Sequence, residues 1–176
     1  IHTKLVLTQA LERRGVAGVV EDGPTPHTFR VRRTLLGSPL ISIIIPTRDR
    51  LSLLRRCIES IEEHTTYKNY EILIIDNGSQ ESQTLRYLAS SSHRVLRDDS
   101  LFNFSRLCNR GAAEAQGQHL LFLNNDMEVL ACDWLEALLE HAQRPEVGAV
   151  GAQLLYADNT IQHAGVVFGI RGVAGH

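Results

Sequence analysis

The chain has 176 residues, of which 43% are hydrophobic and 22% charged, and its formal net charge is −2. This is the composition of an ordinary globular domain, and its charge gives no basis for bulk electrostatic binding to nucleic acid. No apolar run approaches the length of a membrane span. The three isolated cysteines, Cys57, Cys108 and Cys132, form no CxxC pair, which argues against a zinc site or a disulfide framework.

The first 39 residues differ from the rest in pattern. Residues 5–14 predict a short helix that ends at Gly15. Two short β-prone stretches, VAGVV and HTFRVRR, flank the turn-rich segment EDGPTP and predict a possible hairpin. Because Gly37, Ser38 and Pro39 interrupt the pattern, we expect an N-terminal extension over residues 1–39 and a larger domain over residues 40–176.

From residue 40 onward, apolar runs typical of buried strands alternate with helical periodicity. The predicted strands cover residues 40–45, 69–75, 93–96, 119–123 and 147–155, with a further β-prone stretch within 162–173. The predicted helices lie around residues 53–61, 81–89, 104–115 and 134–139. Such alternation predicts an α/β domain whose mostly parallel sheet has helices on both faces.

Two positions carry specific local predictions. Asp49 is a candidate N-cap for the helix that follows it, because its carboxylate can accept from free backbone N–H groups. The small residues Gly111, Ala112 and Ala113 predict close packing of their helix against the sheet, and Gly117 is placed to end that helix in the left-handed conformation.

Polar residues follow three of the predicted strands where each strand ends. The three clusters are PTRD at 46–49, DNGS at 76–79 and NND at 124–126. If the strands are parallel, all three clusters lie at the carboxyl edge of the sheet, where ligands of α/β proteins bind. Amide and carboxylate oxygens at 124–126 are ligands that Mg²⁺ and Mn²⁺ prefer, although a polar strand end that only caps the next helix explains these three residues equally well.

The turn after the first of these strands argues against two common nucleotide sites. A Rossmann dinucleotide site and a Walker phosphate loop both require glycines there, and PTRDR contains none. The phosphates of a nucleotide bound at this edge would instead be neutralised by a metal ion at Asp126.

Three motifs in this order, SIIIPTRDR, EILIIDNGS and NRGAAEAQGQHLLFLNND, resemble those of family 2 glycosyltransferases with the GT-A fold. The later segment VGAVGAQLLYADNTIQHAG is similar to that of bacterial, rhamnosyltransferase-like members that build surface polysaccharides. The resemblance implies an enzyme of polysaccharide or cell-envelope glycan synthesis. It would move a sugar, with inversion, from a UDP- or dTDP-linked donor to a hydroxyl of a glycan or lipid-linked acceptor.

The resemblance also implies a site and a cofactor, Mn²⁺ or Mg²⁺. Asp126 would be the metal ligand and Asn124 a weaker partner, because an amide oxygen carries no charge. The residues implied in binding the nucleotide sugar are Pro46, Thr47, Asp49, Asp76, Asn77, Arg106, Asn109 and Asn125. Asp98 and Asp99, by contrast, are interpreted as a solvated loop or as the N-cap of the helix from Phe104.

The family's general base lies well beyond the metal motif, so the resemblance implies that it lies beyond His176, in an acceptor half outside these residues. We expect the 176 residues to bind donor without transferring sugar. The expected location is the cytoplasm. Regions outside these residues could also contact the inner face of the membrane.

Two alternative functions stay open. One is a nucleotidyltransferase on the same sheet, although no glycine- and lysine-bearing loop is present. The other is a non-catalytic nucleotide-sugar-binding or interaction domain.

Overall fold

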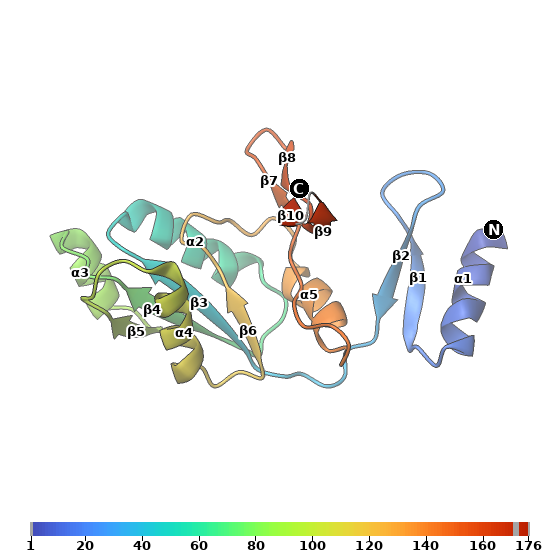
Figure 1. Ribbon diagram of the computed structural model, residues 1–176, viewed down its shortest axis with the longest axis horizontal. Helices are drawn as coiled ribbons and strands as arrows, with labels where there is room; N and C mark the ends of the chain where they lie inside the picture. Colours follow the sequence, from blue (N-terminus) through green and yellow to red (C-terminus); the bar gives the residue numbers. More distant parts are fainter. Residues whose placement is uncertain (1, 171–172, 176) are drawn as a thin grey trace. The chain divides into compact units, whose positions relative to one another are not determined.

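The computed structural model describes residues 2–170 and 173–175 (Figure 1). It divides into two compact units, one made of Leu36–Leu135 and the other of Ile1–Leu35 together with Glu136–His176. The first division falls near the expected boundary at residue 39. The second was not expected, because residues 136–176 group with the N-terminal residues and not with the larger domain.

The central unit is built on a four-stranded parallel sheet with the order β5-β4-β3-β6. Its strands are β3 (Ile41–Thr47), β4 (Tyr70–Asp76), β5 (Arg94–Arg97) and β6 (His119–Phe122). The register places Thr47 beside Asp76 and Asp76 beside Arg97. The predicted parallel α/β architecture is therefore confirmed, and the polar ends of its strands lie along one edge.

Three helices cover this sheet, α2 (Leu51–His64), α3 (Ser82–Ala89) and α4 (Phe104–Glu114). The connections through α2 and α3 step in one direction across the sheet, and the connection through α4 steps back to reach β6. Because parallel crossovers are right-handed, α2 and α3 lie on one face and α4 on the other, as Figure 1 shows. The isoleucine run of β3 is fully buried between them, which explains its unbroken apolar pattern.

Two glycines of the α4 region fit against the sheet for steric reasons. A Cβ on Gly111 would lie 2.4 Å from Cγ2 of Ile44, so the predicted close packing of this helix is confirmed. The prediction for Gly117 is wrong: α4 ends at Glu114, its C-cap residue Ala115 is extended, and Gly117 is not left-handed. Gly117 is needed because a Cβ there would lie 2.6 Å from the backbone nitrogen of Ser42.

Strand β6 departs from the expectation of a strand buried on both faces. It pairs with β3 and is the outermost strand of the described sheet. Leu120 and Phe122 are 43% and 49% exposed, whereas His119 and Leu121 are partly buried. The apolar run at 119–123 predicted the strand but not its position, because an outermost strand can carry the same residues.

The other unit contains helix α1 (His2–Arg13) and an antiparallel hairpin of β1 (Gly18–Asp22) and β2 (Phe29–Arg33). Helix α5 (Trp134–Ala142) begins in the central unit, and its Glu140 is buried in this one. Glu140 accepts from Nε of Arg32 at 2.7 Å and from the backbone N–H of Arg33 at 3.1 Å. This ion pair is one of the contacts that join the residues after 135 to the hairpin.

Short hairpins end the chain. Strand β7 (Leu154–Leu155) pairs with β8 (Ile161–His163), and β9 (Val167–Ile170) pairs with β10 (Val173–Gly175). The strand predicted over residues 147–155 is therefore wrong for all but its last two residues, since Gly148 and Gly151 weaken its strand propensity. Among the described residues, no helix is long and apolar enough to cross a membrane.

Candidate functional site

The ends of β3 and β6 meet at the point where the order of the strands reverses. β3 is the first strand of the sheet in the chain, β6 the last, and the two are neighbours. A hydrogen bond joins their ends, because Nδ2 of Asn125 donates to Oγ1 of Thr47 at 2.8 Å. Ligands of open α/β sheets bind at such switch points, beyond the carboxyl ends of the strands. Thr47 and Asn125, both predicted from the sequence, are thus brought together there.

The ends of β3 and β4 are joined through Asp49. Its Oδ1 accepts from the backbone N–H groups of Gln80 and Glu81, both at 2.8 Å, and its own N–H donates to Oγ of Ser79 at 2.7 Å. The N–H of Glu81, followed by that of Gln80, lowers the pKa of this carboxyl group. Asp49 therefore holds the loop before α3 in place.

The prediction that Asp49 caps α2 is wrong. Helix α2 begins after Arg50 and has no side-chain cap. Asp49 and Arg50 both adopt left-handed backbone conformations, with φ of 53° and 54°, so the chain turns before the helix and directs the Asp49 carboxylate to the neighbouring loop. Consecutive left-handed residues other than glycine are strained, and such strain is concentrated at functional sites.

Asp76 and Arg97 form an ion pair at the ends of β4 and β5. Asp76 is 2% exposed. Its Oδ2 accepts from Nη1 of Arg97 at 2.7 Å, and its Oδ1 accepts from the N–H of Ser79 at 2.9 Å. The resemblance assigns the Asp76 carboxylate to the nucleotide, but the protein itself binds both of its oxygens. Of the two paired side chains, Arg97 is the exposed one.

Asn77 is buried with an acceptor left over. Its Nδ2 donates to the carbonyl oxygens of Asp98, at 3.0 Å, and Ser100, at 2.9 Å. Its Oδ1 is buried and has no hydrogen-bond partner within the described part of the chain. A buried acceptor without a donor costs about 1–3 kcal/mol, so Asn77 lowers the stability of this edge.

Asp98 is a buried carboxylate that two arginines contact. It is 6% exposed, and its carboxylate lies 3.2 Å from Nη1 of Arg110 and 3.9 Å from Nη2 of Arg106. The hydrogen bond from the Ser100 hydroxyl, with its N–H and the two arginines, lowers the pKa of Asp98 to about 2. The interpretation of Asp98 as solvated or as an N-cap is wrong, because the N-cap of α4 is Asn103, which accepts from the N–H of Arg106 at 3.0 Å. Two arginines one helical turn apart were the signal for a buried anion.

The lowered pKa of Asp98 predicts a pH-dependent contribution to stability. A carboxyl group whose pKa is lowered by folding stabilises the protein above its unfolded value, near 3.8, and loses this effect as the pH falls toward 2. We expect Asp98→Asn to lower the urea midpoint at pH 7, and this deficit to shrink between pH 4 and pH 2. Asp22→Asn, at an exposed position, should leave the midpoint near that of the wild type. An Asp98→Asn deficit of equal size at all pH values would contradict the assignment.

The residues after β6 provide free oxygens. Asp126 is exposed, and within the described residues its carboxylate makes no hydrogen bond or ion pair. Asn124 is also exposed, and its backbone oxygen accepts from the buried thiol of Cys57, with sulfur and oxygen 3.7 Å apart. No group of three or more His, Cys, Asp or Glu side chains in the described ranges could hold a metal ion. One carboxylate and one amide suit a hard cation only if a ligand such as a diphosphate completes its coordination.

The amino acid sequence of the chain matches a known family. Residues 42–165 match the family model described as glycosyl transferase family 2. The chain belongs to glycosyl transferase family 2. It is 48% identical over 159 residues to protein y4gI of Sinorhizobium fredii, covering 88% of this chain and 18% of the relative. It is 43% identical over 173 residues to the O-antigen biosynthesis protein RfbC of Myxococcus xanthus, covering 97% and 14%. The chain thus spans less than a fifth of either relative.

Solved structures show the same fold. The mannosyltransferase PcManGT from Pyrobaculum calidifontis, solved in complex with GDP-Man and Mn²⁺, superposes with a TM-score of 0.56 at 17% sequence identity. The match covers 82% of this chain and 41% of that one. The family 2 domain therefore has the GT-A fold that the resemblance implied.

The nucleotide-sugar residues predicted from the sequence form two hydrogen-bonded groups and three further positions. Thr47, joined to Asn125, also accepts from the N–H of Asn77 at 2.8 Å, and Asp49 and Asp76 are joined through Ser79. Pro46 is buried in β3 beside these residues. On α4, Arg106 pairs with Asp98, whereas Asn109 is exposed.

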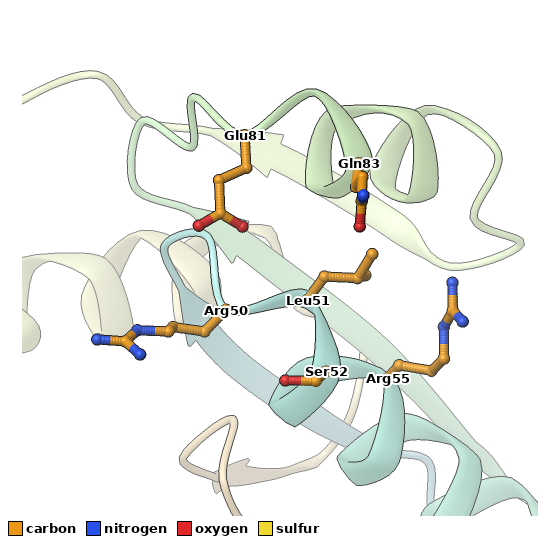
Figure 2. Close-up of a pocket in the computed structure, with 6 residues that line it drawn as sticks. All are labelled: Arg50, Leu51, Ser52, Arg55, Glu81 and Gln83. Atoms are coloured by element: carbon orange, nitrogen blue, oxygen red, sulfur yellow. The ribbon is translucent and has the colours of Figure 1, made fainter.

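A separate hollow lies between the first turns of α2 and α3 (Figure 2). It has a volume of about 380 Å³ and is lined by Arg50, Leu51, Ser52, Arg55, Glu81 and Gln83. None of the predicted site residues lines it. The candidate site of the family 2 domain is therefore the row of strand ends and not this hollow.

Proposed function

We propose that this chain is the donor-binding part of a glycosyltransferase that moves a sugar, with inversion, from a nucleoside diphosphate donor to an acceptor hydroxyl in polysaccharide or cell-envelope glycan synthesis. The observation that carries the proposal is the hydrogen bond from Asn125 to Thr47. It fixes the turn before Asp126 to the end of β3, at the same edge as Asp76 and Asn77. Membership of family 2 and similarity to an O-antigen biosynthesis protein support it.

Asp126 and Asn124 are the residues that would hold a divalent cation, Mn²⁺ or Mg²⁺, together with the donor's diphosphate. Bound there, such a cation supplies Lewis-acid stabilisation of the negative charge on the leaving diphosphate. The free, exposed carboxylate of Asp126 suits this role, because no protein cation competes for it among the described residues. The complex of PcManGT with GDP-Man and Mn²⁺ supports a divalent ion and a nucleotide sugar for the same fold.

The remaining groups of the edge would hold the nucleoside. Asn77 holds the loop after β5 through the carbonyl oxygens of Asp98 and Ser100, and Thr47 and Asn125 fix the strand ends against which the ligand would lie. We propose a UDP- or dTDP-linked donor and a glycan or lipid-linked acceptor. We assign the general base to none of the described residues, since none is placed by a contact on the acceptor side.

The direct test is the binding of nucleoside diphosphates to the full chain, measured by thermal unfolding. UDP, dTDP or GDP with Mn²⁺ should raise the melting temperature, because a ligand at a hundred times its dissociation constant stabilises by about 2.7 kcal/mol. For a chain of this size the rise is roughly 5–10 °C. The rise should need the metal ion. No rise with any of the three in the presence of Mn²⁺ would refute the proposed function.

A further inference from the structure

Arg97 is held by three hydrogen bonds, and its Nη2 nitrogen has no hydrogen-bond partner among the residues that the structure describes. Nε donates to Oδ1 of Asp99 at 2.7 Å, and Nη1 donates to Oδ2 of Asp76 at 2.7 Å and to the carbonyl oxygen of Ser79 at 3.0 Å. A guanidinium has five N–H groups, so three bonds leave the two on Nη2. The side chain is 42% exposed. Arg97 is thus a fixed pair of donors at the edge of the sheet.

The charges around Arg97 favour a neutral partner over a phosphate. Two carboxylates, those of Asp76 and Asp99, contact the one cation, so the group of three residues carries a net charge of −1. A phosphate brought to Nη2 would meet this negative charge, whereas a carbonyl oxygen would not. The two donors are therefore suited to an uncharged acceptor.

The position of Arg97 in the sheet leads to the same conclusion. It ends β5, and Asp126 follows β6, the strand at the other side of the sheet. Three strand spacings separate β5 from β6, which is about 14 Å. If Asp126 holds the diphosphate, a nucleotide lying along the strand ends would bring its other end, the base, toward β4 and β5.

We propose that Arg97 is a specificity-determining residue of the donor site, whose Nη2 donates to a keto oxygen of the nucleobase, and that Asp76 and Asp99 are positioning residues that hold it. This inference rests on the proposed function. Because arginine has donors but no acceptor, it favours the keto oxygen at position 4 of uracil and thymine and at position 6 of guanine. Adenine and cytosine carry an amino group at the corresponding position and are disfavoured.

The test compares the binding of UDP, dTDP, GDP, ADP and CDP to the full chain by calorimetry with Mn²⁺ present. The wild type should bind the three keto nucleotides more tightly than ADP and CDP. Arg97→Gln should lower the affinity for UDP, dTDP and GDP about tenfold to a hundredfold, as expected for the loss of a hydrogen bond from a charged group. The difference from ADP and CDP should then disappear. Arg97→Lys should also lose the ranking, because an ammonium group cannot keep the three bonds that fix the fork.

Further variants separate binding from folding. Arg97→Gln leaves the buried Asp76 carboxylate without its cation, so the double variant Asp76→Asn/Arg97→Gln removes both charges and should also lose the ranking. Asp99→Asn removes only the exposed ion pair with Arg97. It should reduce the difference in affinity between the two groups of nucleotides while the protein stays folded. Arg94→Gln is the matched control, since Arg94 begins the same strand at the opposite edge and pairs with Glu71 and Glu114. It should bind all five nucleotides as the wild type does.

The possible failures are distinguishable. If the wild type binds none of the five nucleotides, the proposed function fails, and this inference fails with it. If the wild type binds them and Arg97→Gln keeps the same ranking, the inference alone is overturned. The affinity for uridine and for UMP should fall by the same factor as the affinity for UDP in Arg97→Gln. A loss that grows with the number of phosphates would place Arg97 against phosphate and would also overturn the inference.

Discussion

Replacing Asp126 with alanine is expected to remove the whole metal-dependent part of the stabilisation by UDP or dTDP. Asp126 is the one carboxylate in the turn after β6 that is exposed and unpaired among the described residues, and Asn124 carries no charge to replace it. Cation affinity falls steeply as charged ligands are lost. The rise of roughly 5–10 °C expected with Mn²⁺ and nucleotide should therefore vanish, while the melting temperature without ligand should change little, because the side chain makes no described contact.

Glu63→Gln is the matched control for this experiment. Glu63 is an exposed carboxylate in the last turn of α2, a helix that starts at the carboxyl edge of the sheet and ends near the opposite edge. This variant should keep the full Mn²⁺-dependent rise. If Asp126→Ala kept it as well, the cation would be bound elsewhere, and the assignment of Asp126 and Asn124 would be withdrawn.

Gly111→Ala should destabilise the central unit even though alanine is the better helix former. The exchange gains about 1 kcal/mol of helix propensity. Against this, the new Cβ would lie 2.4 Å from Cγ2 of Ile44 and 3.2 Å from Cδ1 of Ile75, and both isoleucines are fully buried. Overpacking of a dense core costs about 1–3 kcal/mol or more per site. A contact this short lies at the upper end of that range, so we expect a net loss of about 1–3 kcal/mol, read from the urea midpoint. Gly111→Val should prevent folding of the unit.

Gly148→Ala provides the comparison, because a Cβ at Gly148 would meet no atom within 4 Å and its backbone is not left-handed. Its free energy of unfolding, read from the urea midpoint, should stay within about 0.5 kcal/mol of the wild-type value. A Gly111→Ala variant as stable as this control would mean that α4 can move away from β3. The close packing of Gly111 would then be incidental.

The order of the elements could be predicted from the sequence because it depends on local patterns. Apolar runs such as ISIII and EILII are typical of buried parallel strands, and the alternation with helical periodicity fixes a parallel sheet. A parallel sheet in turn places every strand end at one edge. The predicted residues Thr47, Asp76, Asn77 and Asn125 therefore lie in the same row of strand ends.

The partners of the charged side chains were decided only by the tertiary structure. Local sequence suggested that Asp49 caps the next helix, but two left-handed residues turn the backbone and direct its carboxylate to Gln80 and Glu81. Asp98 looked solvated, yet α4 brings two arginines against it.

Arg97 carried no signal in the sequence at all. It became a candidate only because the register of β4 and β5 sets it beside Asp76. Arg97 and Asp76 are 21 positions apart, and no periodic pattern in the sequence records their pairing. The sequence by itself thus determined the sheet and the edge at which a ligand would bind. The tertiary structure decided which side chains at that edge are held by the protein and which remain free to meet a ligand.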